Sequence, residues 1–129
     1  MSKAALKTIK DSMKEIGINY QFKKWKGHPA YPYFVGSYQE VPTPGEDGMQ
    51  ETTFILTGFA RSDGKMDGVL QLEDAKEKIE NYFNTGKVVN ADGSAVAIFY
   101  ANTFGDLPTG DAELEKIEIN LTIKEWRVK

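Results

Sequence analysis

The chain has 129 residues, no cysteine and a formal net charge of −3. Its length is that of one domain, and its 40% hydrophobic and 27% charged residues are sufficient for a folded core. The lack of cysteine excludes disulfides, thiolate nucleophiles and metal sites with cysteine ligands, and the acidic balance argues against sequence-independent nucleic-acid binding.

The hydrophobic segments are too short for a membrane protein. The longest uncharged apolar run, residues 95–101, falls far short of the roughly 20 residues that span a bilayer. Charged residues interrupt the first segment, which therefore lacks the apolar stretch of a signal peptide. We expect no membrane partner and a cytoplasmic location.

The first segment predicts a helix over residues 3–16. Ser2 is a suitable N-cap, and Gly17 a suitable C-terminal stop. Apolar residues recur between them at spacings of three and four, at Leu6, Ile9, Met13 and Ile16. Residues 19–25 then alternate as a half-exposed strand.

Prolines and a loop separate the next two predicted strands. His28 to Pro32 is a bend, because each proline fixes its own φ and restricts the preceding residue. Strands follow at residues 33–41 and 51–60, with a Pro- and Gly-rich loop at 42–50 between them. The strand at 51–60 is apolar on both faces, which predicts a central position in the sheet.

A second helix and three strands complete the chain. A loop at 61–68 precedes a helix over 70–83, whose apolar positions are Leu72, Ala75, Ile79 and Phe83. Strands at 88–91 and 95–102 are separated by Asp92-Gly93, a hairpin turn signal. The last strand alternates from Ile117 to Ile123, and its phase then slips, which predicts a bulge near Lys124-Glu125.

This order, α-β-β-β-α-β-β-β, predicts a single α+β domain over residues 1–129. Short connections between strands favour a mainly antiparallel sheet, with both helices packed on one face. The sequence contains no internal repeat and no domain linker.

Residues that would support catalysis or metal binding are few. The only histidine, His28, lies in the proline bend, where we interpret it as a loop residue. Asp63, Asp67 and Asp74 have part of the spacing of a calcium loop, but Lys65 occupies a ligand position and Asp74 is too short for the last one. We interpret this segment as a turn that caps the second helix, and we predict no enzyme activity, cofactor or metal.

The residues 31–38 (YPYFVGSY) and 51–62 (ETTFILTGFARS) show a family resemblance. Together with the acidic loop between them and the helix that follows, they resemble the tail-completion, or tail-terminator, proteins of long-tailed bacteriophages and prophages. The resemblance covers nearly the whole chain, although these motifs are not catalytic.

The resemblance implies a structural protein that forms a ring, usually a hexamer, at the head-proximal end of the tail tube. Its partners would be other copies of itself, the tail-tube protein and the head connector, and DNA would pass through the ring without specific binding. The protein would work in the cytoplasm of the host bacterium and remain in the virion tail.

Several residues are candidates for contacts between subunits. The loops 42–50 and 61–69 offer charges of both signs and methionines, and tyrosines are enriched at interfaces. The candidates are Tyr33, Glu46, Asp47, Met49, Arg61, Asp63, Lys65, Met66 and Asp67. Of the aromatic residues between Tyr31 and Tyr38, we expect about half in the core and the rest at an interface.

Two alternatives remain open. Within virion assembly, the chain could be another head–tail connector or a tail-tube subunit. As a different class, it could be a small α+β enzyme or ligand-binding domain, which would require a deep apolar cavity with convergent polar groups.

Overall fold

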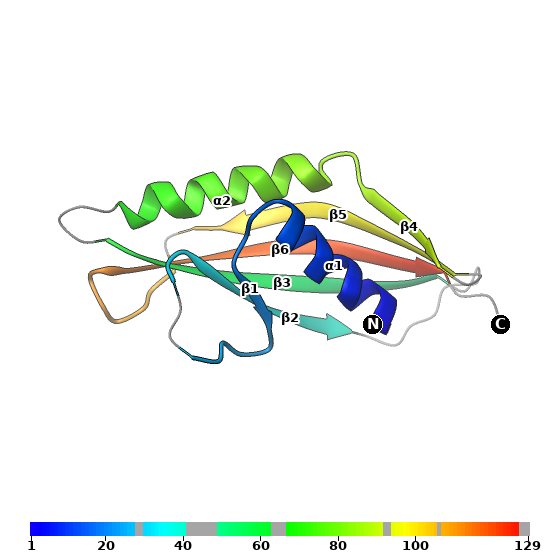
Figure 1. The fold of residues 1–129 in the computed structure, drawn as a ribbon, viewed down its shortest axis with the longest axis horizontal. Coiled ribbons are helices and arrows are strands. Elements are labelled where there is room, and N and C mark those ends of the chain that lie inside the picture. The colour runs from blue at the N-terminus through cyan, green and yellow to red at the C-terminus, as the bar shows by residue number, and fades with distance from the viewer. Residues whose placement is uncertain (28–29, 41–48, 63–66, 92–93, 106, 127–129) are drawn as a thin grey trace.

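The computed structural model describes residues 1–27, 30–40, 49–62, 67–91, 94–105 and 107–126. Two helices pack on one face of a six-stranded sheet (Figure 1). The helices are α1 (Lys3–Glu15) and α2 (Gly68–Phe83), and the strands are β1 (Tyr20–Phe22), β2 (Tyr33–Glu40), β3 (Met49–Arg61), β4 (Lys87–Ala91), β5 (Ser94–Phe104) and β6 (Leu114–Trp126). The predicted fold class and element order are confirmed.

The strands lie in the order β1-β2-β3-β6-β5-β4. Every neighbouring pair is antiparallel except β1 and β2, which are parallel. The long strand β3 lies between β2 and β6, as its two apolar faces predicted. The hairpin predicted around Asp92-Gly93 is also present, because Ala91 pairs with Ser94 in the β4–β5 ladder.

Both helices begin at capping residues: α1 follows Ser2, as predicted, and α2 follows Asp67, starting two residues before the predicted residue 70. The Ser2 hydroxyl accepts a hydrogen bond from the Ala5 amide at 3.1 Å, and Gly17 ends α1 with a positive φ of 77°. In α2, the Asp67 carboxylate accepts from the Leu70 amide at 3.2 Å. The interpretation of this segment as a helix-capping turn is therefore confirmed for Asp67.

The core lies between the helices and one face of the sheet. Alternate residues of β3 and β6 point into it, and they meet the apolar stripes of the two helices. The largest fully buried side chains include Phe34, Phe54, Leu56, Phe83, Ile119, Leu121 and Ile123. Gly58 also faces this core, and a Cβ atom there would lie 2.3 Å from the Phe34 ring, so the missing side chain makes room for that ring.

The bulge predicted near Lys124-Glu125 is wrong. β6 pairs with β3 without a shift as far as Trp126, and the irregularity in the sheet lies instead in β5, between Tyr100 and Asn102. Glu125 explains the error, because this charged residue is buried on the helix side, where its carboxylate accepts from the Ser2 amide at 3.0 Å. The strand keeps its alternation, and only the polarity of one residue departs from the pattern.

Some predicted element boundaries also need correction. The loop predicted over 42–50 ends earlier, because β3 already begins at Met49. The loop predicted over 61–69 is shorter at both ends, because Arg61 belongs to β3 and Gly68 to α2. The strand predicted over 19–25 is reduced to β1. Neither helix of the described chain is both long and apolar enough to cross a bilayer.

Candidate interaction face

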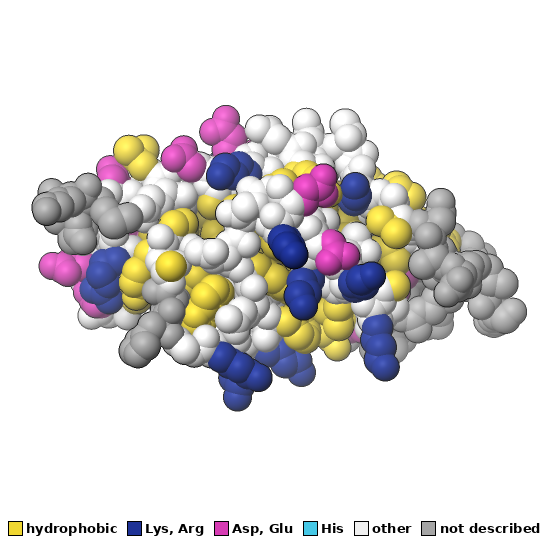
Figure 2. Space-filling model, viewed as in Figure 1, with side chains coloured by type: hydrophobic (Ala, Val, Ile, Leu, Met, Phe, Trp, Pro, Cys, Tyr) yellow, Lys and Arg dark blue, Asp and Glu magenta, His cyan; other side chains and the backbone are white. Residues whose placement is uncertain are grey.

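The sheet has one face that neither helix covers. Strand alternation places Ile55, Thr57 and Phe59 of β3 on this open face, opposite the buried residues Phe54, Leu56 and Gly58. The register of the sheet places Tyr33 of β2 directly beside Phe59. Figure 2 shows the opposite side of the molecule, where positively and negatively charged side chains are scattered over the helices.

One end of the open face carries an aromatic cluster formed by Trp25, Tyr31, Tyr33 and Phe59. Tyr33 is its centre, with ring centroids 5.0 Å from Trp25, 5.5 Å from Tyr31 and 5.1 Å from Phe59. Each ring is partly exposed. These contacts join the segment before β2 to the two neighbouring strands, and they present a broad apolar surface with polar tips to the surroundings.

Two cations border the aromatic cluster. The Arg61 guanidinium lies 5.7 Å from the centre of the Tyr31 ring, and the Lys116 ammonium lies 5.8 Å from that of Phe59. Arg61 also forms ion pairs with Asp111 at 3.4 Å and Glu113 at 3.7 Å. These charged groups are partly or largely exposed, so their ion pairs contribute little to the stability of the fold.

The surroundings raise the pKa values of Tyr33 and Arg61. Burial raises the pKa of Tyr33 above its ordinary value, the neighbouring Tyr31 raises it further, and Arg61 lowers it by a smaller amount. A hydrogen bond with Tyr31 is the main reason why the pKa of Arg61 is raised. The cluster therefore holds the Tyr33 phenol beside the Arg61 cation.

The middle of the open face is polar. The side-chain Nδ2 of Asn120 donates to Oδ1 of the Asn102 side chain at 2.8 Å and to the Glu118 carboxylate at 3.3 Å. Asn120 is 9% exposed, so the two partners satisfy a side chain that is nearly buried in the sheet surface. Beyond this network, Phe104 of β5 is 53% exposed. The face thus combines apolar rings with fixed amide and carboxylate groups.

The structure brings two of the predicted interface residues together. Tyr33 and Arg61 both contact Tyr31 within the aromatic cluster and its border. Met49 lies at the other end of β3, paired with Trp126, and Asp67 is occupied as the N-cap of α2. The remaining candidates, Glu46, Asp47, Asp63, Lys65 and Met66, fall outside the described residues, as does His28.

Sequence reasoning did not select Trp25, Phe59 and Lys116 as interface residues. The sequence did hint at Phe59, because it lies on the face of β3 opposite the main core. A large apolar residue in that position is usually covered by another part of the chain or by another molecule. Trp25 was visible only as the centre of a lysine-rich segment, whose lysines 23, 24 and 26 are exposed. The convergence of Trp25 on Tyr33 depends on the path of the chain between β1 and β2, which local patterns do not reveal.

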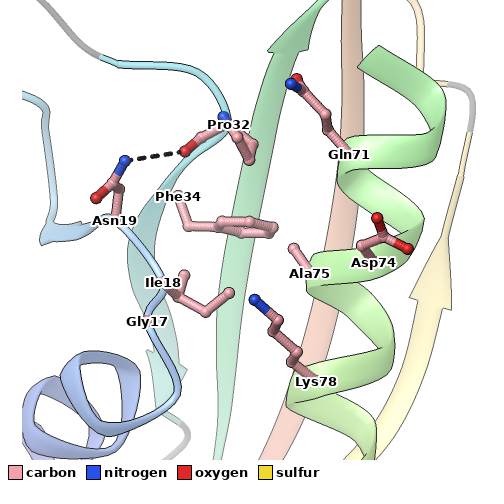
Figure 3. A pocket seen from close by; sticks show the side chains of 9 residues that line it. All are labelled: Gly17, Ile18, Asn19, Pro32, Phe34, Gln71, Asp74, Ala75 and Lys78. Atoms are coloured by element: carbon pink, nitrogen blue, oxygen red, sulfur yellow. Dashed lines mark hydrogen bonds between the residues drawn. The ribbon is translucent and has the colours of Figure 1, made fainter. Parts of the chain in front are cut away.

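A groove also opens on the helix side, between α2 and the segment that links α1 to β1 (Figure 3). Its volume is about 240 Å³, with Ile18, Pro32, Phe34 and Ala75 forming the apolar lining and Gln71, Asp74 and Lys78 contributing polar groups from α2. The Asn19 amide donates to the Pro32 carbonyl at 3.3 Å at one wall. Within the described chain, no three acidic or histidine side chains converge as metal ligands.

The chain was also compared with known proteins. No protein-family model matches it, and it has no significant match among curated proteins or solved structures.

Proposed function

We propose that this protein is a structural subunit of a bacteriophage tail, which forms a ring at the head-proximal end of the tail tube. In this role it stops growth of the tube and docks the tail to the head connector. The proposal rests on the sequence resemblance described above and on the open face of the sheet. It assigns no catalytic role to the protein.

The observation that carries the proposal is the position of the two segments that show the resemblance. Residues 33–38 and 54–59 pair with each other in β2 and β3, and their outward side chains include Tyr33 and Phe59 of the aromatic cluster. A helix-free sheet face with clustered aromatic residues and bordering cations has the composition of a protein interface, in which tyrosine, tryptophan and arginine are enriched.

A ring requires two different patches on each subunit. The strand β3 separates two such regions, because Arg61 and the aromatic cluster lie at one end and Met49 and Trp126 at the other. Thirteen residues of extended chain span about 40 Å. The predicted contact loops, which flank β3 at its two ends, therefore belong to different patches, as a head-to-tail contact between neighbouring subunits requires.

The decisive experiment is deletion of the gene from the phage or prophage that encodes it, followed by electron microscopy of the lysate. The proposal predicts separate heads and tails, with tails of irregular length. Normal virions from the deletion would overturn it.

The loops can be tested separately in the same system. Replacement of residues 42–48 or 63–66 by a short Gly-Ser link leaves β3 and α2 intact, and we expect the same assembly defect with a folded subunit. Normal virions from these variants would remove only the loops from the interface.

The groove beside α2 favours a second candidate, a small ligand-binding domain. Its volume of about 240 Å³ lies just below the roughly 300–1,000 Å³ of typical ligand sites, and it combines an apolar lining with four polar side chains. A ligand-binding role predicts that a small molecule found by thermal-shift screening raises the melting temperature of the purified protein, and that Lys78→Ala removes this shift. A shift that Lys78→Ala leaves unchanged would count against the groove as a ligand site.

A further inference from the structure

The edge strand β4 has a backbone pattern that is complementary to itself. It forms one margin of the sheet, and no described element lies beyond it (Figure 1). Such an edge presents unpaired amide and carbonyl groups, which are a template for another strand. Its residues Val88 and Val89 favour extended structure, and the Val88 side chain is 59% exposed.

The direction of each backbone group in β4 follows from the hairpin. Ala91 pairs with Ser94 across a two-residue connection, and the pair that flanks such a turn is hydrogen-bonded. Hydrogen-bonded pairs alternate in an antiparallel ladder, so Val89 and Lys87 also bond to β5. The amide and carbonyl groups of Val88 and Asn90 therefore point outward, toward the free edge.

The other margin of the sheet differs. β1 has three residues, and the next residue, Lys23, has a positive φ of 69°, which ends the extended conformation. Lys24 follows, so the edge is both short and charged, as is usual for edges that avoid pairing. β4 has no proline, and its one charge is at its first residue, Lys87.

We infer that β4 is a strand-addition site for a second copy of this chain, and that two β4 strands pair antiparallel across a two-fold axis at Val89. In this register Val88 lies opposite Asn90 of the partner strand, so the outward groups of both residues exchange hydrogen bonds. Val89 lies opposite its own copy, which gives a cross-strand pair of β-branched side chains.

Charge supports this register. Lys87, the only charged residue of β4, lies opposite Ala91 of the partner strand, so the two lysines are separated by the length of the strand. The paired sheets then form one continuous sheet through two subunits. The inference concerns an edge, not the open face, and it stands independently of the proposed role in a phage tail.

Single-cysteine variants test this register directly, because the chain contains no cysteine of its own. Across the two-fold axis the Val89 positions form a non-hydrogen-bonded pair with Cα atoms about 4.5 Å apart, within the range of a disulfide. The Val88 positions lie about 8–9 Å apart by strand spacing and rise, beyond the limit of about 7 Å. Val88→Cys is therefore a matched control, with a more exposed side chain at a neighbouring position.

We expect purified Val89→Cys to form a disulfide-linked dimer in a glutathione redox buffer at least about tenfold faster than Val88→Cys, because the paired thiols have a high effective concentration. Sedimentation equilibrium of the unmodified protein should show a species of twice 14.4 kDa that grows with concentration, whether or not larger rings also form.

A charged variant provides an independent measurement. Val89→Lys places like charges opposite each other, and we expect it to remain monomeric where the unmodified protein dimerises. Val88→Pro, whose lost amide points outward, should keep the fold and also remain monomeric. Equal cross-linking rates for the two cysteine variants, or an unmodified protein that stays monomeric throughout the series, would overturn the inference.

Discussion

The two faces of the sheet are built from the same strands but differ in burial and composition. On the helix side, β3 contributes Phe54 and Leu56, which are fully buried against the two helices. On the open side, the intervening residues Ile55, Thr57 and Phe59 are only partly buried, and they lie among tyrosines, amides and cations. The first face supplies most of the buried core, and the second is exposed to the surroundings.

This difference in burial concerns β3 in particular, which has apolar residues on both faces. A strand in a sheet covered on one side normally alternates between apolar and polar residues. Here the second apolar set has no helix to bury it, and it is partly covered by the loop that carries Trp25 and Tyr31. An apolar second face without a second layer is a signal of interaction with another molecule.

The largest expected effect is on the buried face. Leu56→Ala should lower the free energy of unfolding by about 2–5 kcal/mol, because it removes a fully buried side chain from a close-packed core. Ile55→Ala, one residue away on the open face, should cost clearly less. Chemical denaturation of both variants measures the difference, and equal losses would show that the two faces are equally buried.

Gly58→Ala tests the packing of the glycine against an aromatic ring. The added Cβ would meet the buried Phe34 ring at 2.3 Å, so we expect a loss of about 1–3 kcal/mol in the free energy of unfolding. Thr57→Ala is the control on the adjacent, open-face position and should be close to neutral. A Gly58→Ala protein as stable as the original would contradict the described fit of Phe34.

The aromatic cluster should contribute less than the core to the stability of the isolated protein. Tyr33→Phe retains the ring and removes only a partly exposed hydroxyl, so we expect a change within about 0.5 kcal/mol by thermal denaturation. Phe59→Ala should cost about 1–2 kcal/mol, since it removes a half-buried ring and its contact with Tyr33. A loss as large as that of Leu56→Ala would place Phe59 in the core instead of at an interface.

The smallest expected effect is a difference in alkaline stability between Tyr20, which packs against the core, and Tyr33, on the open face. Burial raises the pKa of Tyr20 and of Tyr33, the former more strongly. A raised pKa in the folded state adds stability that is complete below the unfolded value of about 10 and is lost as the pH rises through the folded pKa. Tyr20→Phe should therefore reduce the alkaline loss of stability above pH ~10 more than Tyr33→Phe. Identical alkaline unfolding curves for the two variants would contradict this order.

Much of the fold could be predicted because it depends on local patterns. The apolar stripes of the helices, the caps at Ser2 and Asp67, and the hairpin at Asp92-Gly93 each act over a few residues. The bulge prediction failed because Glu125 is buried with a partner, Ser2, from the other end of the chain. For the same reason only Tyr33 of the aromatic cluster was predicted as an interface residue. The other rings come from separate segments, which the sheet register brings beside it.

The proposed role of the open face in virion assembly can be tested most directly by complementation. A phage lacking the gene would be supplied with the double variant Tyr33→Ala and Phe59→Ala, after circular dichroism has shown that the variant is folded. We predict that electron microscopy of the lysate will show heads and tails that remain separate, while the control Thr53→Ala, on the same face outside the cluster, restores joined virions. Joined virions in normal numbers from the folded double variant would contradict the assignment of the aromatic cluster as a contact surface.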